Sequence, residues 1–280
     1  KKRTSCKLKA KAKGTAKITC TVKRKKKTYK LTCKVKVKAK KTVVASSLKD
    51  TYAKIVPYMG TCLNYGSASN PRELQNASTM KFVKKQYNSF TLENEMKPDA
   101  ILGSSAKLIS VADAKKKGYY IPAGYTESTV PELAFTTVDK SLEAAKNNGL
   151  KMRAHTLVWH SQTPSWFFTK NYDGSKVVTP AVMDARLDFY IHNVMGHIMD
   201  KEKALTGSAG SIVYAWDVVN EYLHRPSFAF FKTWTSVYGD MGNSPSYVKK
   251  AFEIAYDMLK SYQATDKVTL FYNDYNTYFG

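Results

Sequence analysis

Long apolar runs and cysteine motifs are missing from this sequence. No stretch of about 18 consecutive apolar residues occurs, so no transmembrane helix is predicted. The four cysteines are Cys6, Cys20, Cys33 and Cys62, and none of them stands in the C-x-x-C spacing of a metal site. G-x-S-x-G and glycine-rich phosphate-binding loops are also absent. These absences argue against a membrane-spanning protein, a cysteine-held zinc, a nucleophile-elbow hydrolase and a phosphate-loop protein.

Acidic residues are absent from the first part of the chain. Residues 1–45 hold 19 Lys and Arg and no Asp or Glu. The whole chain has 45 basic and 22 acidic residues, so residues 46–280 hold 26 basic and 22 acidic, a net charge of +4. The sequence therefore predicts two domains, a basic β-rich segment over 1–45 and a near-neutral domain over 46–280. The apolar fraction of 43% suits a globular core.

Lysine alternates with apolar residues or threonine from Gly14 to Lys38. This period of two predicts two strands, with a turn at the basic run Arg24–Lys27. In the expected register Cys20 lies opposite Cys33 and Val22 lies opposite Leu31. Both a cross-strand disulfide and two free buried thiols are compatible with that pairing.

The basic segment has two interpretations. A run of lysines can bind nucleic acid or another polyanion, or it can be the solvated face of a small β-domain. Strands that bind nucleic acid usually carry aromatic residues, and only Tyr29 is present, so no nucleic-acid partner is predicted. The stretches G-T-A-K-I-T and K-V-K-V-K resemble the end of a bacterial immunoglobulin-like module of the second type. That resemblance implies a secreted or cell-surface bacterial protein, attached through a preceding region. The stretch T-V-V-A-S-S is the expected linker, and no signal peptide is visible.

Strands and helices are predicted to alternate beyond residue 46. This order is typical of a parallel α/β sheet and of a (β/α)8 TIM barrel, of which five units are recognisable. At about 30 residues for each unit, three more are expected after Gly280. The segment Pro98–Phe135 is expected to be a long loop with a short helix near Ser110–Lys117. The predicted strands cover 57–65, 87–92, 151–156, 212–219 and 268–272, and the predicted helices cover 48–56, 80–85, 138–148, 181–199 and 247–261.

Polar side chains gather directly after these strands. The carboxyl ends of parallel strands meet at one edge of a sheet, so these side chains are expected to form one site. Amides, imidazoles, an indole and a lysine suit an uncharged sugar chain, and neither a metal nor a cofactor is predicted. The residues are Glu93, Asn94, Lys97, His155, Trp159, His160, Gln162, Asn220, Glu221, Asn273, Asp274 and Asn276.

Four motifs on successive strands carry a family resemblance. F-T-L-E-N-E-M-K, H-T-L-V-W-H-S-Q-T-P-S-W-F, A-W-D-V-V-N-E and L-F-Y-N-D-Y-N together resemble glycoside hydrolase family 10, the endo-1,4-β-xylanases. The resemblance covers Leu48 to Gly280. Ala154 is a departure, because the family often has glycine there. Membership implies endo-acting hydrolysis of xylan or xylo-oligosaccharides by a retaining double displacement.

The resemblance implies a role for each matching residue. Glu221 matches the general acid/base, and Asn220 matches the residue that binds the 2-hydroxyl of the sugar under attack. The other matching positions bind substrate. They are Glu93, Asn94 and Lys97 on the non-reducing side, and His155, Trp159 and Gln162 around the reacting sugar.

Retaining hydrolysis needs a second carboxyl group, about 5–5.5 Å from the first. Asp217 lies four residues before Glu221 and is expected low in the barrel, and Glu95 and Asp274 match no family nucleophile. The family nucleophile follows a later strand, so it is expected beyond residue 280. The 280-residue chain alone is therefore expected to be poorly active, with open sheet edges and an exposed apolar barrel interior.

Other functions remain open at this point. A degenerate barrel could bind xylan without cleaving it, and the chain could be an inactive fragment. A surface adhesin could use residues 1–45 as its working part. Cellulose is the nearest alternative substrate, because one hydroxymethyl group separates the two polymers.

Overall fold

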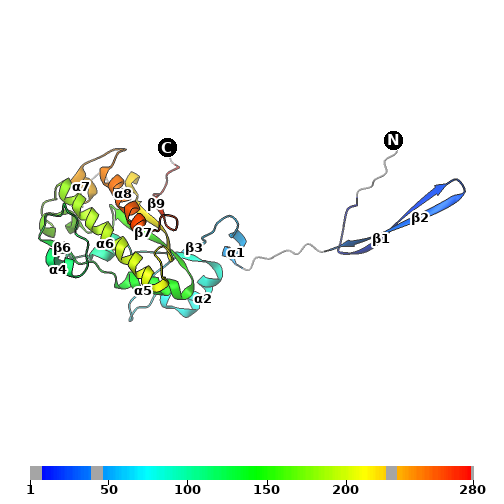
Figure 1. The fold of residues 1–280 in the computed structure, drawn as a ribbon, viewed down its shortest axis with the longest axis horizontal. Helices are drawn as coiled ribbons and strands as arrows, with labels where there is room; N and C mark the ends of the chain where they lie inside the picture. Colours follow the sequence, from blue (N-terminus) through cyan, green and yellow to red (C-terminus); the bar gives the residue numbers. More distant parts are fainter. Residues whose placement is uncertain (1–7, 39–46, 225–231, 279–280) are drawn as a thin grey trace. The chain divides into compact units, whose positions relative to one another are not determined.

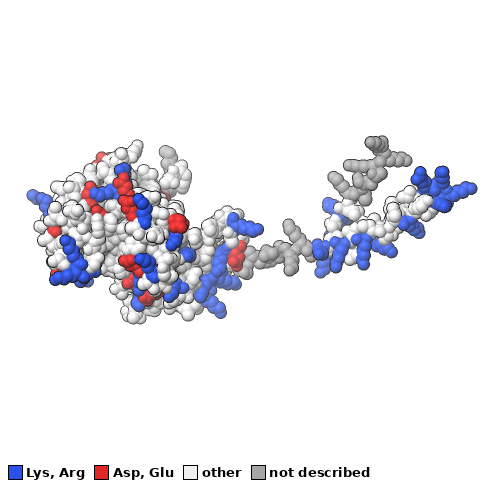
Figure 2. All heavy atoms as spheres, in the orientation of Figure 1, with Lys and Arg blue, Asp and Glu red and all other residues white. Residues whose placement is uncertain are grey.

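The computed structural model describes residues 8–38, 47–224 and 232–278. The chain divides into two compact units, Lys1–Ser46 and Ser47–Gly280. Figure 2 shows basic side chains crowding the first unit and both signs of charge on the second. Cys6 and the expected linker, apart from Ser47, lie outside the described residues.

The first unit contains one antiparallel hairpin. Strand β1 covers Gly14–Arg24 and β2 covers Lys27–Val37, as predicted. The expected register was wrong: Cys20 pairs with Leu31 and Cys33 pairs with Ile18. The cause is a two-residue turn at Lys25 and Lys26, with Arg24 already paired to Lys27, which moves every partner by two residues. The length of the loop fixes the register of a hairpin, and a run of lysines does not indicate how many residues the loop contains.

The hairpin has one apolar face and one lysine–threonine face. Ile18, Cys20 and Val22 share a face with Leu31 and Cys33, because side chains alternate along each strand and these residues pair across it. Both cysteines are free and exposed, so neither the disulfide nor the buried thiols are present. No described residue of the hairpin is fully buried.

The second unit is built on a parallel sheet of five strands, in the order β3-β4-β7-β8-β9. This confirms the five predicted strands. The strands are β3 (Gly60–Leu63), β4 (Ser89–Leu92), β7 (Lys151–Trp159), β8 (Val213–Asn220) and β9 (Thr269–Asn273). Consecutive strands are neighbours and each crossover contains helix, which is the α/β arrangement expected from the sequence.

Three long helices lie side by side against this sheet (Figure 1). Helix α5 covers Thr136–Asn148 and ends at Gly149, whose φ of 63° is the left-handed conformation that glycine adopts freely. Helix α6 covers Pro180–Thr206, with proline in its first turn, where the missing N–H costs nothing. Helix α8 covers Ser246–Ser261 and packs against α6.

The shorter helices lie in the crossovers. The predicted helix over 48–56 ends early, at Tyr52. The segment Pro98–Phe135 is more ordered than expected, since it contains the antiparallel pair β5 (Leu108–Ser110) and β6 (Thr129–Pro131). The short helices are α1 (Leu48–Tyr52), α2 (Ala77–Gln86), α3 (Pro98–Leu102), α4 (Val111–Lys116) and α7 (Trp234–Tyr238).

The two faces of the sheet differ in chemistry. Ala154 and Trp216 are paired neighbours, at most 1% exposed, and belong to the core on the helix-covered face. Alternation places Arg153, His155 and Asp217 on the opposite face. The expectation of an apolar interior needs correction there: an ion-paired cluster occupies this face, although Phe271 of β9 is 37% exposed beside it. Strands β3 and β9 are the sheet edges among the described residues, as predicted.

Candidate active site

The last residues of β7, β8 and β9 lie next to one another in the sheet. Trp159 pairs with Asn220, and Asn220 pairs with Asn273 across the parallel sheet. The Asn273 side-chain amide donates to Oδ1 of Asn220 at 2.7 Å. Because Asn220 is only 2% exposed, this bond fixes the orientation of its amide.

Glu221 follows β8 in an unusual backbone conformation. Its φ is 55°, and its N–H donates to the carbonyl of Asn273 at 2.8 Å. A left-handed non-glycine residue costs about 1–3 kcal/mol and persists where the surroundings hold it. The indole Nε1 of Trp159 donates to Oε2 of Glu221 at 2.9 Å. Backbone and side chain together therefore hold this carboxyl group at the strand ends.

Lys97 links the ends of β4 and β7. Its ammonium donates to Oδ1 of Asn94 at 3.0 Å and to Oε1 of Gln162 at 2.7 Å, and it lies 5.1 Å from the ring centroid of Trp159. The Gln162 amide also donates to Asn94 at 3.1 Å. Four residues from two motifs thus form one polar cluster around an aromatic ring.

His155 is oriented by a buried carboxylate. Its Nδ1 lies 2.9 Å from Oδ2 of Asp217, which is 2% exposed. Nε of Arg153 donates to the same carboxylate at 3.0 Å. Asp217 was considered from the sequence only as a second reacting carboxylate, and here it is occupied by two partners. The signal for this pairing was the two-residue spacing of Arg153 and His155, which places both on one face of β7.

Asn64 is a site residue that the sequence analysis missed. Its amide donates to Oε2 of Glu93 at 3.0 Å, so it orients a carboxylate that the sequence analysis assigned to substrate binding. Asn64 directly follows β3, in the same position relative to its strand as the other site residues. That position was a usable signal.

Two further carboxylates at the strand ends are occupied. Glu95 accepts from the backbone N–H groups of Tyr65 at 2.9 Å and Asn94 at 3.1 Å. Asp274 accepts from the Tyr272 hydroxyl and lies 2.6 Å from Nδ1 of His224. Burial alone would raise the pKa of Asp274, but these hydrogen bonds outweigh it and hold the pKa below its ordinary value. Both groups therefore hold neighbouring loop segments in place.

Protonation of His160 is expected to weaken the fold. Burial lowers its pKa, despite the carboxylates of Glu221 and Asp274 nearby. A depressed folded-state pKa means that the unfolded chain binds the proton more tightly, so stability falls as the pH drops through the unfolded value of about 6.5. Denaturant unfolding across that range, with His160→Gln as the comparison, measures it. A pH slope unchanged by the substitution would contradict the assignment.

The described residues do not provide a metal site, since no group of three or more His, Cys, Asp or Glu is arranged to hold an ion there. Nor does any helix in the described ranges have the length and apolar character needed to cross a bilayer.

A carboxyl group, an indole and a cluster of amides at the carboxyl edge of a parallel sheet are the groups expected at the site of a glycoside hydrolase built from βα units. The chain belongs to glycosyl hydrolase family 10, whose model matches residues 47–279. The family fold is a (β/α)8 barrel, and the family resemblance inferred from the four motifs is confirmed. The immunoglobulin-like resemblance of the first unit stays a prediction.

Curated relatives carry the same family assignment. Endo-1,4-β-xylanase A of Butyrivibrio fibrisolvens is 47% identical over 234 residues, which cover 83% of this chain and 53% of that protein. Endo-1,4-β-xylanase A of Thermotoga neapolitana is 37% identical over 205 residues, covering 72% of this chain and 15% of that protein. The chain therefore spans about half the length of the first relative and far less of the second.

Solved structures of xylanases also resemble this chain. Modules of Clostridium thermocellum xylanase 10B, in complex with xylohexaose, match with a TM-score of 0.61 and 29% identity, over 90% of this chain and 43% of that one. A glutamate-to-alanine variant of the Thermoanaerobacterium saccharolyticum xylanase, in complex with xylotriose, matches with a TM-score of 0.54 and 26% identity, over 84% of this chain and 58% of that one.

Proposed function

We propose that this protein hydrolyses internal β-1,4-xylosidic bonds of xylan with retention of configuration, and that Glu221 is its general acid/base. The observation that carries the proposal is the bond from Trp159 Nε1 to Glu221, which joins this carboxyl group to the indole ring that Lys97 also approaches. Relatives named endo-1,4-β-xylanase and neighbours bound to xylo-oligosaccharides support the substrate class.

The remaining site residues are assigned to substrate binding. Asn220 donates its amide N–H to the 2-hydroxyl, since Asn273 already occupies its oxygen. Trp159 offers a ring face to a pyranose. The contact with Asp217 orients His155, which also binds the reacting sugar. Glu93, Asn94 and Lys97 bind hydroxyls on the non-reducing side, and Gln162 binds around the reacting sugar.

The second carboxylate is assigned to none of the described strand-end groups. Asp217, Glu95 and Asp274 are each held by other partners, and Glu93 is held by Asn64. We therefore propose that the nucleophile is a glutamate outside residues 1–280. The chain by itself is expected to bind xylan and to cleave it very slowly.

An external anion can test this assignment. Azide is expected to replace the nucleophile: its nitrogen attacks the anomeric carbon of phenyl β-xylobioside, the glycosidic bond breaks, and Glu221 gives its proton to the departing phenol oxygen. One displacement leaves α-xylobiosyl azide. Phenol release by the chain should therefore rise with azide concentration, and Glu221→Gln should lower it by about 10²–10⁴-fold.

Two comparisons make the result specific. Dinitrophenyl β-xylobioside has a leaving group that needs no proton, so Glu221→Gln should spare its azide-dependent release. Glu253→Gln changes an exposed carboxylate on α8 and should leave both substrates unaffected. Absence of any azide effect in the unaltered chain would contradict the proposed role of Glu221. Rapid, retaining hydrolysis without azide would place the nucleophile within this chain.

We also propose that the protein acts outside the cell, on the cell surface or after secretion. Xylan is a polymer too large to enter a cell, and the lysine-rich hairpin suits a spacer that precedes the catalytic domain. The proposed spacer is a bacterial immunoglobulin-like module over 1–45, and the proposed catalytic domain covers 46–280.

A further inference from the structure

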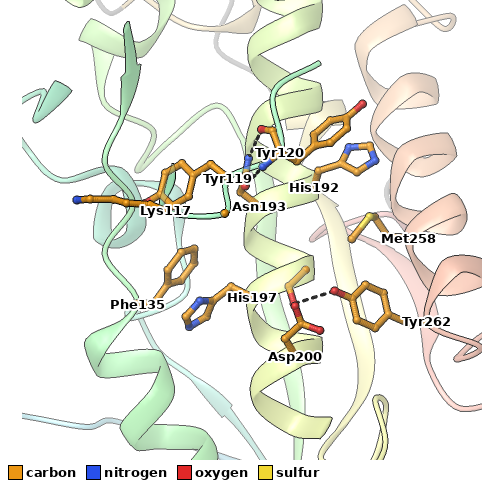
Figure 3. A pocket seen from close by; sticks show the side chains of 12 residues that line it. Lys117, Tyr119, Tyr120, Phe135, His192, Asn193, His197, Asp200, Met258 and Tyr262 are labelled. Carbon is orange, nitrogen blue, oxygen red and sulfur yellow. Dashed lines mark hydrogen bonds between the residues drawn. The ribbon is translucent and has the colours of Figure 1, made fainter. Parts of the chain in front are cut away.

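A cavity lies among the helices that cover the sheet, and it shares no residue with the proposed site at the strand ends. Its volume is about 440 Å³. Helix α6 forms its floor, and α8 and the segment that contains Lys117–Tyr120 form its walls (Figure 3). This volume is within the range of about 300–1,000 Å³ that is usual for small-ligand sites.

Gly196 lies at the middle of the floor. His192 and Asp200 are one helical turn before and after it on the same face of α6. A glycine inside a helix costs about 0.5–1 kcal/mol relative to alanine. An added Cβ would make only ordinary contacts, 3.5 Å from Met258 Cε and 3.6 Å from the Tyr262 hydroxyl. Helix packing therefore does not demand glycine here, and its effect is to keep the hollow open.

Aromatic rings form the walls. Tyr120 stacks on His192 with ring centroids 4.0 Å apart, and Phe135 stacks on His197 at 3.8 Å. Asn193 binds both backbone polar groups of Tyr120 at 2.9 Å, so the segment that carries this tyrosine is fixed to α6. Tyr120 remains 43% exposed. A ring that is fixed in place and still exposed can stack on a flat ligand.

Two ionisable groups that line the cavity, His197 and Lys117, are paired with carboxylates of the protein. His197 Nε2 lies 2.8 Å from Asp139, and Lys117 is paired with Glu132. Asp200 interacts with the hydroxyl of Tyr262; burial, together with this hydrogen bond, raises the pKa of Tyr262 to about 12. Nδ1 of His197 and Nε2 of His192 have no hydrogen-bond partner among the described residues. The cavity thus offers open hydrogen-bonding atoms and one carboxylate, that of Asp200, which can accept from hydroxyl groups, and this set suits a neutral polyhydroxylated ligand.

We propose that this cavity is an accessory binding site for a neutral sugar chain, with Tyr120 as its stacking platform and Gly196 as its floor. That the sugar chain is xylan rests on the proposed function, whereas the sugar-binding character rests on the cavity itself. A site of this kind would hold the polymer near the catalytic domain without taking part in the reaction.

Histidine signals can test the site directly. The chain has five histidines, of which His192 and His197 line the cavity, whereas His155 lies on β7 and His160 and His224 follow strand ends, and these three give the strand-end signals. We would label histidine Cε1 with ¹³C, titrate the chain with xylotetraose at constant pH, and assign each signal by substitution with glutamine. The signals of His192 and His197 are expected to shift, with a saturation curve distinct from that of the strand-end signals.

Matched variants separate stacking from general effects. Tyr120→Ala should abolish the shifts of the two cavity signals and keep those of the strand ends. Tyr256→Ala removes another exposed tyrosine, on α8 and outside the cavity, and should change neither set. Gly196→Gln fills the hollow from its floor and should act like Tyr120→Ala without lowering thermal stability.

Each outcome has one meaning. Cavity signals that stay still while strand-end signals move would overturn the accessory site and leave the proposed function intact. Cavity signals that move while strand-end signals stay still would support the accessory site and count against the proposed catalytic site at the strand ends. Shifts of the cavity signals that survive Tyr120→Ala and Gly196→Gln would overturn the proposal.

Discussion

Replacing Arg186 with alanine is expected to destabilise the second unit by about 3–5 kcal/mol, because it leaves a buried partner charge uncompensated. The Arg186 side chain is fully buried, and its guanidinium donates to both carboxylate oxygens of Glu127, at 2.7 and 2.5 Å. It also donates to the carbonyl of Phe167 at 2.6 Å and lies 3.7 Å from the ring centroid of Tyr172. This one side chain ties α6 to the segment before β6 and to the loop that follows Gln162.

Guanidinium chloride unfolding, followed by circular dichroism, measures this effect. Lys249→Ala is the matched control, since Lys249 forms an exposed ion pair with Glu253 on α8. Pairs of that kind contribute about 0.3–0.5 kcal/mol. A loss of less than about 1 kcal/mol for Arg186→Ala would show that water or neighbouring groups compensate Glu127 and that the interaction is not central.

Replacing Lys97 with alanine is expected to weaken xylotetraose binding at the strand ends by about 10- to 100-fold. A hydrogen bond to a charged group contributes about 1.5–3 kcal/mol, and about 1.4 kcal/mol is a factor of ten. Lys97 is the common donor to Asn94 and Gln162 and lies near the face of Trp159. Its removal takes away one contact to the sugar and loosens two others.

Tryptophan fluorescence can follow this binding, because Trp159 lies in the cluster. The control is Lys81→Ala, an exposed lysine on α2. Equal affinities for Lys97→Ala and the unaltered chain would remove Lys97 from the site. Equal losses for both lysine variants would indicate a general charge effect instead. Cellotetraose, titrated alongside, decides between xylan and cellulose.

The sequence predicted the elements that carry the site. Each strand-end motif follows an apolar run directly, so the order of strands along the chain already places Asn94, Lys97, Gln162, Asn220 and Glu221 at one edge of a parallel sheet. The helix end at Gly149 was also readable, because it depends on a local backbone preference, whereas the helix that ends at Tyr52 was predicted to continue to Val56.

Other features depend on contacts between segments that are distant in the chain, and the local sequence pattern does not predict such contacts. The hairpin register followed from a two-residue turn within a run of lysines, and the β5–β6 pair formed inside a segment that showed no periodicity. The polar inner face arose because Arg153, His155 and Asp217 meet across two strands.

The sequence by itself determined the family, the parallel α/β sheet and the identity of the residues at its edge, because those follow from residue type and order along the chain. Only the tertiary structure decided which of those residues touch. Trp159 holds Glu221, Lys97 binds Gln162, and Asn64 holds Glu93. The two residues of each pair are at least 29 residues apart in the chain. Such contacts are set by how strands and loops pack against one another, and packing is a property of the folded chain.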